Sequence, residues 1–189
     1  MTASNPSQSQ EIELLPAWVN PDLDRLMVVR KGTGDFSSWA ESLVDLPAGA
    51  LFARITGVTP KYGNNSDLES REKERTYSSL QVSRNLSIEL NSDLLYMNHS
   101  CEPSLEIDTA RMEVRVAAGR GLRKGDALTF FYPSTEAAMA QPFDCRCGSK
   151  KCLGRVRGAS ELPKEGLEGY YLNDYIRELL AEKNGTAKV

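Results

Sequence analysis

The sequence predicts a mostly β domain with short helices, in the α+β class. The chain has 189 residues, 40% of them hydrophobic, which suits one compact domain with one core. Short segments in which apolar and polar residues alternate recur along its middle, as is typical of half-buried strands. Glycine-containing turns separate these segments, and only the C-terminal region spaces its apolar residues as a helix does.

The N-terminal half is expected to contain a tail, two strand regions and an insert. Residues 1–15 are rich in polar uncharged side chains and are predicted to be disordered. A short apolar run is followed by turns at Gly32 and Gly34. The segment LFARITGV, residues 51–58, is predicted to be one strand. Residues 60–78 are polar and rich in charge, so we expect an insert that forms a loop with a short solvated helix.

The second half alternates strands and turns before it ends in a helix. SSLQVSRNLSIEL predicts two strands joined by a turn near Arg84, and RMEVRV predicts a strand with one apolar face. LRKGDALTFFY predicts a turn and then a strand that runs to Tyr132. Residues 160–185 are predicted to form a helical extension with a C-cap at Asn184-Gly185. Its apolar residues lie at helical intervals: Leu172, Tyr175, Ile176 and Leu179.

Composition and charge exclude several classes of partner and location. The net charge of −3 argues against a surface that binds nucleic acid directly. No apolar run approaches the roughly 20 residues that span a bilayer, so no membrane partner is expected. The polar N-terminus lacks the apolar segment of a secretory signal. We therefore expect the protein in the nucleus or the cytoplasm, where thiols stay reduced.

The four cysteines form a pattern typical of a structural zinc site. Cys145, Cys147 and Cys152 lie in the run CRCGSKKC, with the spacing C-x-C-x4-C. Structural zinc is tetrahedral and needs a fourth ligand, for which Cys101 is the only remaining cysteine. The alternatives are inert surface thiols, disulfides in an exported protein, or a Cys101 that fills the core and binds nothing.

Three motifs follow one another in an order and spacing that identify a family. They are NHSCEPS (98–104), KGDALTFFY (124–132) and FDCRCGSKKCLG (143–154). The first two resemble the signature motifs of SET-domain lysine methyltransferases, and the third resembles the post-SET zinc segment of that family. RKGTGDF and LPAGALFARITG are similar to the N-terminal half of the family's domain. The resemblance predicts a SET domain at residues 20–135 and a post-SET segment at residues 140–158.

The resemblance implies a fold and a cofactor. The fold would be a β-clip of small curled sheets, in which the C-terminal part of the SET domain threads beneath a loop as a pseudoknot. The methyl donor would be S-adenosylmethionine. By analogy with the family, the turn at Gly32 and Gly34 would lie against this cofactor, and Asn98 and His99 would contact it.

The resemblance also assigns the catalytic and metal-binding residues. Tyr132 would lie at the methyl-transfer centre and beside the cofactor, and Phe130 would tune how many methyl groups are added. In the family a phenylalanine at this position goes with di- or trimethylation. One structural Zn²⁺ would be held by the cysteine of the first motif together with the three of the third: Cys101, Cys145, Cys147 and Cys152.

Each of these residues also has a plainer interpretation. Asn98 could cap a turn, and His99 could be a core histidine with satisfied hydrogen bonds. Tyr132 could simply end a strand before a proline, with Phe130 in the core. A Gly-x-Gly turn occurs in many unrelated loops. The motif around each residue favours the functional interpretation.

Four positions depart from the pattern of the family. Ser104 stands where an asparagine is usual, and Phe131 stands where an aspartate is usual. Leu95 replaces a common arginine, and Ile55 replaces a common channel tyrosine. The main hypothesis is methylation of a protein lysine, on a histone tail or another protein. The departures motivate two alternatives: a SET scaffold that acts on a small metabolite, and a non-catalytic module that binds cofactor or protein.

Overall fold

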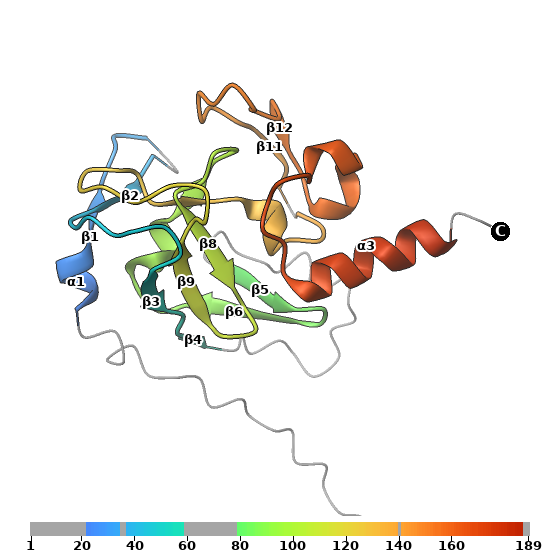
Figure 1. Ribbon diagram of the computed structural model, residues 1–189, viewed down its shortest axis with the longest axis horizontal. Helices are drawn as coiled ribbons and strands as arrows, with labels where there is room; N and C mark the ends of the chain where they lie inside the picture. The colour runs from blue at the N-terminus through green and yellow to red at the C-terminus, as the bar shows by residue number, and fades with distance from the viewer. Residues whose placement is uncertain (1–21, 35–36, 59–78, 140, 187–189) are drawn as a thin grey trace, which may run out of the picture.

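The computed structural model describes residues 22–34, 37–58, 79–139 and 141–186. Within these ranges short strands and 3-10 turns predominate, and the helix α3, Asp174–Thr186, is the longest element (Figure 1). The prediction of a mostly β domain with short helices is confirmed. The predicted disordered tail and the insert at 60–78 lie outside the described residues.

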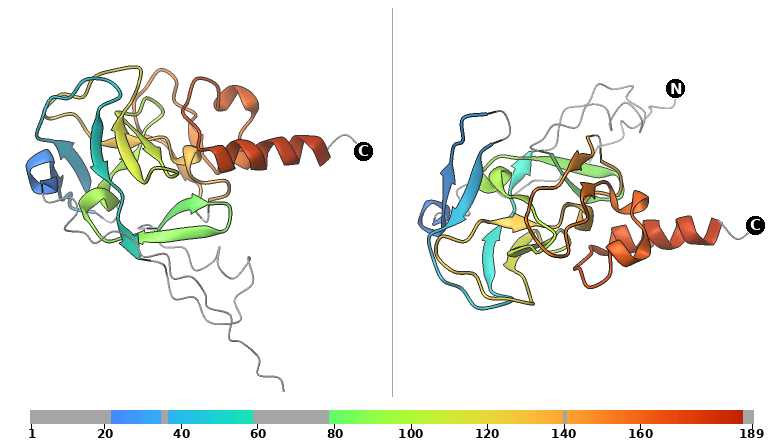
Figure 2. Two further views of the ribbon diagram at one scale, coloured as in Figure 1. Left: turned by 60° about the horizontal axis from the view of Figure 1, so that its bottom comes forward. Right: turned by 90° about the horizontal axis from the view of Figure 1, so that it is seen from above.

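The N-terminal part forms a single helical turn and a hairpin. α1, Leu23–Leu26, leads into β1, Met27–Arg30, which pairs antiparallel with β2, Trp39–Ser42. The predicted turn at Gly32 and Gly34 lies between these strands. The helical turn and hairpin lie at the end of the molecule opposite α3 (Figures 1 and 2).

Two three-stranded antiparallel sheets enclose the main core. One has the order β3-β9-β8, with bounds Leu51–Arg54, Glu113–Val116 and Leu105–Asp108. The other has the order β4-β6-β5, with bounds Gly57–Val58, Leu86–Leu90 and Ser79–Ser83. The predicted alternation is confirmed in β9, where Val114 and Val116 are fully buried. The two strands predicted on either side of Arg84 are β5 and β6.

The segment predicted as one strand from residue 51 to residue 58 is two strands, so that prediction is wrong. β3 pairs with β9, whereas β4 pairs with β6. A Cβ atom on Gly57 would lie 2.6 Å from the carbonyl oxygen of Glu89, so only glycine allows so close a pairing. The chain changes partner between Arg54 and Gly57, and this change splits the strand.

Two further element boundaries differ from the predictions. The strand expected to reach Tyr132 ends at Phe130: β10 is Thr129–Phe130, and the 3-10 turn η3, Tyr132–Ser134, follows it. A proline suits the first turn of a helix, where its missing N–H is not needed. The expected C-cap at Asn184-Gly185 lies within α3. One glycine costs a helix only about 1 kcal/mol, which does not end it.

The first two sequence motifs meet in the centre of the molecule. β7, Asn98–His99, pairs in parallel with β10, and Phe130 is opposite His99. The 3-10 turn η2, Asp93–Tyr96, leads into β7. Because the backbones of the two motifs are hydrogen-bonded neighbours, the side chains that follow each strand are brought to one place.

The C-terminal part adds a second, smaller core. β11, Phe143–Asp144, pairs with β12, Arg155–Val156, and the 3-10 turns η4, Ala159–Glu161, and η5, Lys164–Gly166, follow. This core contains Phe131, Ala159, Leu167 and Ile176. No helix in the part of the chain that the structure describes is long and apolar enough to cross a membrane.

Asn173 joins the C-terminal segment to the main sheet. Its side chain is almost fully buried, and its Oδ1 accepts hydrogen bonds from the backbone N–H (2.9 Å) and the hydroxyl (3.0 Å) of Thr109. Its Nδ2 donates to the carbonyl oxygens of Ile107 and Ser134, each at 2.9 Å. One amide thus holds β8, η3 and the approach to α3 together.

Replacing Asn173 with alanine is expected to lower the free energy of unfolding by about 3 kcal/mol or more, because several buried backbone groups lose their partners. Chemical denaturation of the purified protein would measure this loss. Asn85→Ala is the control, because Asn85 is exposed in the β5–β6 turn and its loss is expected to cost less than about 0.5 kcal/mol. Equal losses in the two variants would contradict the role of Asn173.

Candidate functional site

The candidate site lies where β7 and β10 end side by side. Tyr132 follows β10 closely, and its backbone N–H donates to Nδ1 of His99 at 3.2 Å. Its hydroxyl donates to the carbonyl oxygen of Met97 at 3.3 Å. Both ends of Tyr132 are therefore fixed by the first motif and by Met97 directly before it, although His99 and Tyr132 are 33 residues apart in the chain.

Aromatic rings surround Tyr132. The ring centroid of Phe130 lies 4.7 Å away, that of His99 5.3 Å, and that of Phe143 6.0 Å. Burial among these rings, reinforced by the charge of Glu136, raises the pKa of Tyr132 to about 12. The hydroxyl is therefore neutral at physiological pH. It can donate or accept a hydrogen bond, but it is too weak an acid to supply a useful fraction of phenolate as a base.

The glycine turn predicted to lie at the cofactor is held against β7. Nδ2 of Asn98 donates to the carbonyl oxygen of Ser38 at 2.9 Å, which ties the segment after the turn to the first motif. A Cβ atom on Gly32 would lie 2.6 Å from the carbonyl oxygen of Ser37, whereas one on Gly34 would have no atom within 4 Å. Gly32 is therefore required for tight folding of the turn, and Gly34 leaves an open surface. Such a surface fits a cofactor that lies against the backbone.

His99 is buried and uses both ring nitrogens within the protein. Nδ1 accepts the N–H of Tyr132, and Nε2 lies 3.3 Å from Sγ of Cys101. Burial lowers the pKa of His99 to about 4, so its ring is neutral. Any contact between His99 and a cofactor would therefore have to use its backbone.

The four cysteines meet at one point. Their sulfur atoms all lie within 4.8 Å of one another, and the pair from the two distant motifs, Cys101 and Cys145, is 4.0 Å apart. All four are free thiols, so the disulfide alternative is not the arrangement found here. Cys101 is buried and precedes β8, whereas the other three lie in the loop between β11 and β12.

The chemistry of this donor set fits a zinc ion. Four sulfurs at about 2.3 Å from a tetrahedral Zn²⁺ would be about 3.8 Å from one another, close to the spacing found. Burial raises the pKa of Cys101 to about 11 and also raises that of Cys145. Burial also opposes ionisation of Cys147, but hydrogen bonds to its sulfur outweigh it and lower the pKa to about 6. A divalent cation would offset the repulsion that keeps the thiols from ionising together.

Ser104, at the position where the family usually has asparagine, joins the two motifs through hydrogen bonds. Its hydroxyl donates to the carbonyl oxygen of Ala127 at 2.7 Å and accepts the N–H of Thr129 at 3.0 Å. Ser104 is fully enclosed, so these bonds lie away from water. This departure preserves the connection between the two motifs.

Phe131 stacks on a residue from the C-terminal segment. Its ring lies parallel to that of Tyr170, with the centroids 3.7 Å apart. The Tyr170 hydroxyl donates to the carbonyl oxygen of Cys101 at 2.7 Å. Phe131 therefore belongs to the second core, which a buried aspartate at this position would disrupt.

The other two departures lie in different surroundings. Ile55 is buried in the main core, so no hydroxyl enters the site from this position. Leu95 is half-buried in η2, three residues before Asn98. Neither side chain adds a polar group to the site, which makes it more apolar than the family pattern implies.

The sequence predictions did not assign Phe143 to the site, nor a partner to Tyr170. Phe143 begins the third motif and places its ring 5.9 Å from that of His99 and 6.0 Å from that of Tyr132. Its position directly before the cysteine run was a usable signal, because β11 must approach Cys101 if all four cysteines are to meet. The partner of Tyr170 had no comparable signal in the spacing of residues.

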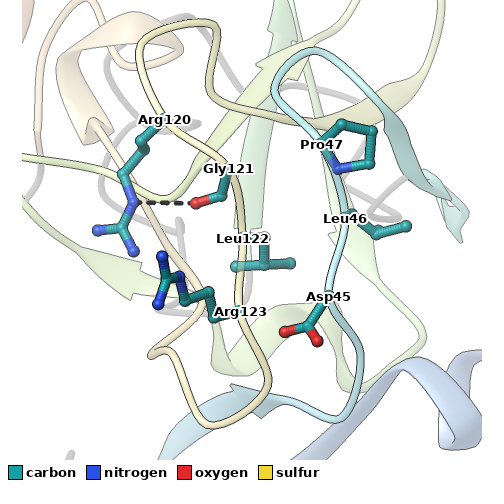
Figure 3. A pocket seen from close by; sticks show the side chains of 7 residues that line it. All are labelled: Asp45, Leu46, Pro47, Arg120, Gly121, Leu122 and Arg123. Carbon is teal, nitrogen blue, oxygen red and sulfur yellow. Dashed lines mark hydrogen bonds between the residues drawn. The ribbon is translucent and has the colours of Figure 1, made fainter.

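A separate cavity of about 730 Å³ lies between two neighbouring loops (Figure 3). Leu46 and Leu122 pair there through backbone hydrogen bonds of 2.9 Å in both directions. The remaining lining residues are Asp45, Pro47, Arg120, Gly121 and Arg123. None of them is among the predicted catalytic, cofactor-binding or metal-binding residues, so this cavity is distinct from the candidate site.

Comparisons with known proteins found a relative that matches nearly the whole chain. No protein-family model matches. The methyltransferase flvH of Aspergillus flavus is 46% identical over 174 residues, which cover 92% of this chain and 92% of that protein. The histone-lysine N-methyltransferase ash1 of Drosophila melanogaster is 24% identical over 155 residues, which cover 77% of this chain but only 7% of ash1.

One solved structure aligns with part of this chain. The structure of KRYPTONITE in complex with mCHH DNA, an H3(1-15) peptide and SAH aligns with a TM-score of 0.47 and 19% sequence identity. The alignment covers 68% of this chain and 29% of that one.

Proposed function

The chain belongs to the SET-domain methyltransferase family, and from that premise we propose that it transfers methyl groups from S-adenosylmethionine to a lysine side chain of a protein. The substrate would be a histone tail or another protein, in the nucleus or the cytoplasm. The ash1 match supports a lysine acceptor, because that protein is named as a histone-lysine N-methyltransferase.

One observation carries the proposal: the backbone of Tyr132 is held by His99 of the first motif, and its hydroxyl by Met97 directly before that motif. The same motif holds the glycine turn through Asn98. The residues expected at the donor and those expected at the acceptor are thus parts of one hydrogen-bonded unit. Methyl transfer is an in-line displacement, so alignment of this kind can supply much of the rate.

The chain's residues would prepare the acceptor amine for attack. When bound, S-adenosylmethionine supplies a methyl group activated by a sulfonium charge. A lysine ammonium, with a reference pKa of about 10.4, must lose a proton before it can attack. The apolar rings of Phe130 and Phe143 disfavour a charged amine and so lower its pKa. The Tyr132 hydroxyl donates to Met97, which leaves its lone pairs to accept an N–H and orient the nitrogen.

We propose that the four cysteines hold one structural Zn²⁺. All four positions of a tetrahedral ion would be filled by thiolates, so no position remains for water or substrate. Three of these ligands follow Phe143, whose ring lies beside Tyr132. The ion would therefore fix the aromatic wall of the site without taking part in the reaction.

Incubation with S-adenosylmethionine labelled in its methyl group tests the activity. We expect label on the lysines of a protein in a nuclear or cytoplasmic extract, or on histones, and mass spectrometry would locate it. Calorimetry with S-adenosylhomocysteine is the companion measurement. Cofactor binding without labelled protein would point to another acceptor, and the absence of binding would favour a non-catalytic module.

A small-molecule amine is the second candidate acceptor. The composition of the site favours it, because Ile55 and Leu95 leave the site without polar groups common in the family. The name of flvH, which matches almost the whole chain, specifies no acceptor. In the same incubation, label that stays with the low-molecular-weight fraction of the extract would support this candidate.

Replacing Phe130 with tyrosine is expected to shift the product towards monomethylation. The Phe130 ring lies 4.7 Å from that of Tyr132 and is buried, so an added hydroxyl would occupy space beside the acceptor and bind its nitrogen. Mass spectrometry would measure the ratio of mono- to di- and trimethylated product. Phe52→Tyr is the control, since Phe52 is buried in β3. An unchanged ratio would mean that Phe130 does not limit the product.

A further inference from the structure

The one histidine of the chain lies between the cysteine cluster and Tyr132. Its Nδ1 is 3.2 Å from the backbone nitrogen of Tyr132, and its Nε2 is 3.3 Å from Sγ of Cys101. The residue is 9% exposed, and its ring is tilted against that of Phe131, with the centroids 5.7 Å apart. Both hydrogen-bonding positions of His99 are therefore in use, and packing restricts its rotation.

These contacts determine the tautomer. A backbone N–H can only donate, so Nδ1 of His99 must accept and carries no proton. In a neutral imidazole the proton is then on Nε2, which points at the sulfur of Cys101. The N–H of Leu153 donates to the same sulfur at 3.4 Å. Two donors directed at one sulfur are the arrangement that stabilises a thiolate bound to a metal.

The bond to Tyr132 satisfies a group that η3 leaves without a partner. Tyr132 is the first residue of this 3-10 turn, and the first N–H groups of a helix have no acceptor within it. Phe131 at the N-cap makes no side-chain capping bond. His99 therefore serves as the cap of the turn that sets the direction of the Tyr132 side chain.

We infer that His99 is a positioning residue that couples the zinc-bound thiolate of Cys101 to the backbone of Tyr132. The inference rests on the zinc site and the role of Tyr132 in the proposed function. Through His99, metal binding orders the active site directly, by two hydrogen bonds that run from Cys101 to Tyr132. The metal also holds the loop between β11 and β12. The side chain of His99 is thus assigned to the metal centre and Tyr132 rather than to the cofactor.

Two substitutions test separately the hydrogen bond of His99 to Cys101 and its hydrogen bond to Tyr132. His99→Asn places an amide oxygen near the position of Nδ1, which keeps an acceptor for Tyr132 and loses the donor to Cys101. His99→Gln places an amide nitrogen near the position of Nε2, which keeps the donor and loses the acceptor. We expect His99→Asn to release zinc to a chelator about 10- to 100-fold faster, and its cobalt-substituted form to show a shifted thiolate-to-cobalt absorption band.

We expect His99→Gln to keep the zinc release rate and the cobalt spectrum. Its kcat should fall about 10-fold or more, with little change in KM for the cofactor, because misplacement of Tyr132 affects the transfer step. With zinc in excess, His99→Asn should lose less of its kcat than His99→Gln, because it keeps the acceptor for the backbone N–H of Tyr132. Equal behaviour of the two variants, in zinc release and in kcat, would overturn the inference.

A measurement on the unaltered protein decides the question if either variant fails to fold. Nitrogen-15 NMR of the single histidine reports which ring nitrogen carries the proton. We expect the proton on Nε2, and a scalar coupling between this proton and cadmium-113 when cadmium replaces zinc. A proton on Nδ1 in the zinc-loaded protein would refute the role of His99 alone. A purified protein that contains no zinc would instead refute the metal site of the proposed function.

Discussion

Replacing Cys101 with serine is expected to abolish stable zinc binding and to reduce methyl transfer at least about 100-fold. Cys101 is the one ligand that does not come from the β11–β12 loop, so its loss leaves three thiolates on one loop and no metal link to the first motif. Structural zinc contributes about 10–16 kcal/mol in small metal-binding peptides, so the weakened site should release its ion on dialysis. Metal analysis after dialysis would measure the zinc-to-protein ratio.

The local loosening of the structure should spare the main core. The main core contains none of the cysteines, and Val114, Ile107 and Ile88 within it are fully buried. Hydrogen exchange should therefore increase around β11 and β12 and remain slow in β8 and β9. Lys151→Ala is the control, because this exposed residue lies in the same loop and offers no ligand. Full zinc content and full activity in Cys101→Ser would contradict a four-cysteine site.

Replacing Tyr132 with phenylalanine is expected to lower kcat about 100-fold. The substitution removes the hydroxyl that donates to Met97 and keeps the ring among Phe130, His99 and Phe143. The nitrogen of the acceptor then loses the group that orients it, and poor alignment of reacting atoms costs about 100-fold in rate. Steady-state kinetics with labelled cofactor would measure the loss.

The affinity for S-adenosylhomocysteine and the thermal stability should change little in Tyr132→Phe, because one part-buried hydrogen bond of 3.3 Å contributes about 1 kcal/mol. Tyr171→Phe removes a tyrosine hydroxyl from the half-buried C-terminal segment and is the control. A kcat that equals that of the unaltered protein would remove the Tyr132 hydroxyl from the mechanism. A loss of cofactor binding would instead indicate that it shapes the donor pocket.

Local pattern predicted much of the sheet. Alternation placed Val114 and Val116 towards the core, and a turn near Arg84 was found between β5 and β6. The same reasoning failed at residues 51–58, because alternation does not reveal a change of partner strand. It also failed at Tyr132, where a strand was expected and a 3-10 turn begins. Both errors occur where a distant segment, rather than the local sequence, supplies the hydrogen bonds.

The candidate site was predicted in part. Cysteine spacing and count led to the cluster that the structure brings together. The resemblance assigned Asn98, His99 and Tyr132 to one site, but the pairing of β7 with β10 was not predicted. The stacking of Phe131 on Tyr170 was not foreseen. This stacking depends on how the C-terminal segment packs against the rest of the molecule. The spacing of apolar residues within that segment does not indicate which ring Tyr170 contacts.

The sequence by itself determined which residues are present for the chemistry. These are four thiols in a zinc-binding pattern and a tyrosine that ends the second motif, and the segments around them were predicted to form short strands. Only the tertiary structure decided their contacts. It placed His99 between Cys101 and Tyr132, and the hydroxyl of Tyr170 on the carbonyl oxygen of Cys101. The physical reason is that buried positions recur in the sequence with the period of a strand or a helix, so that the sequence reveals them. A hydrogen bond between residues 33 or 69 positions apart instead depends on how whole segments pack against one another.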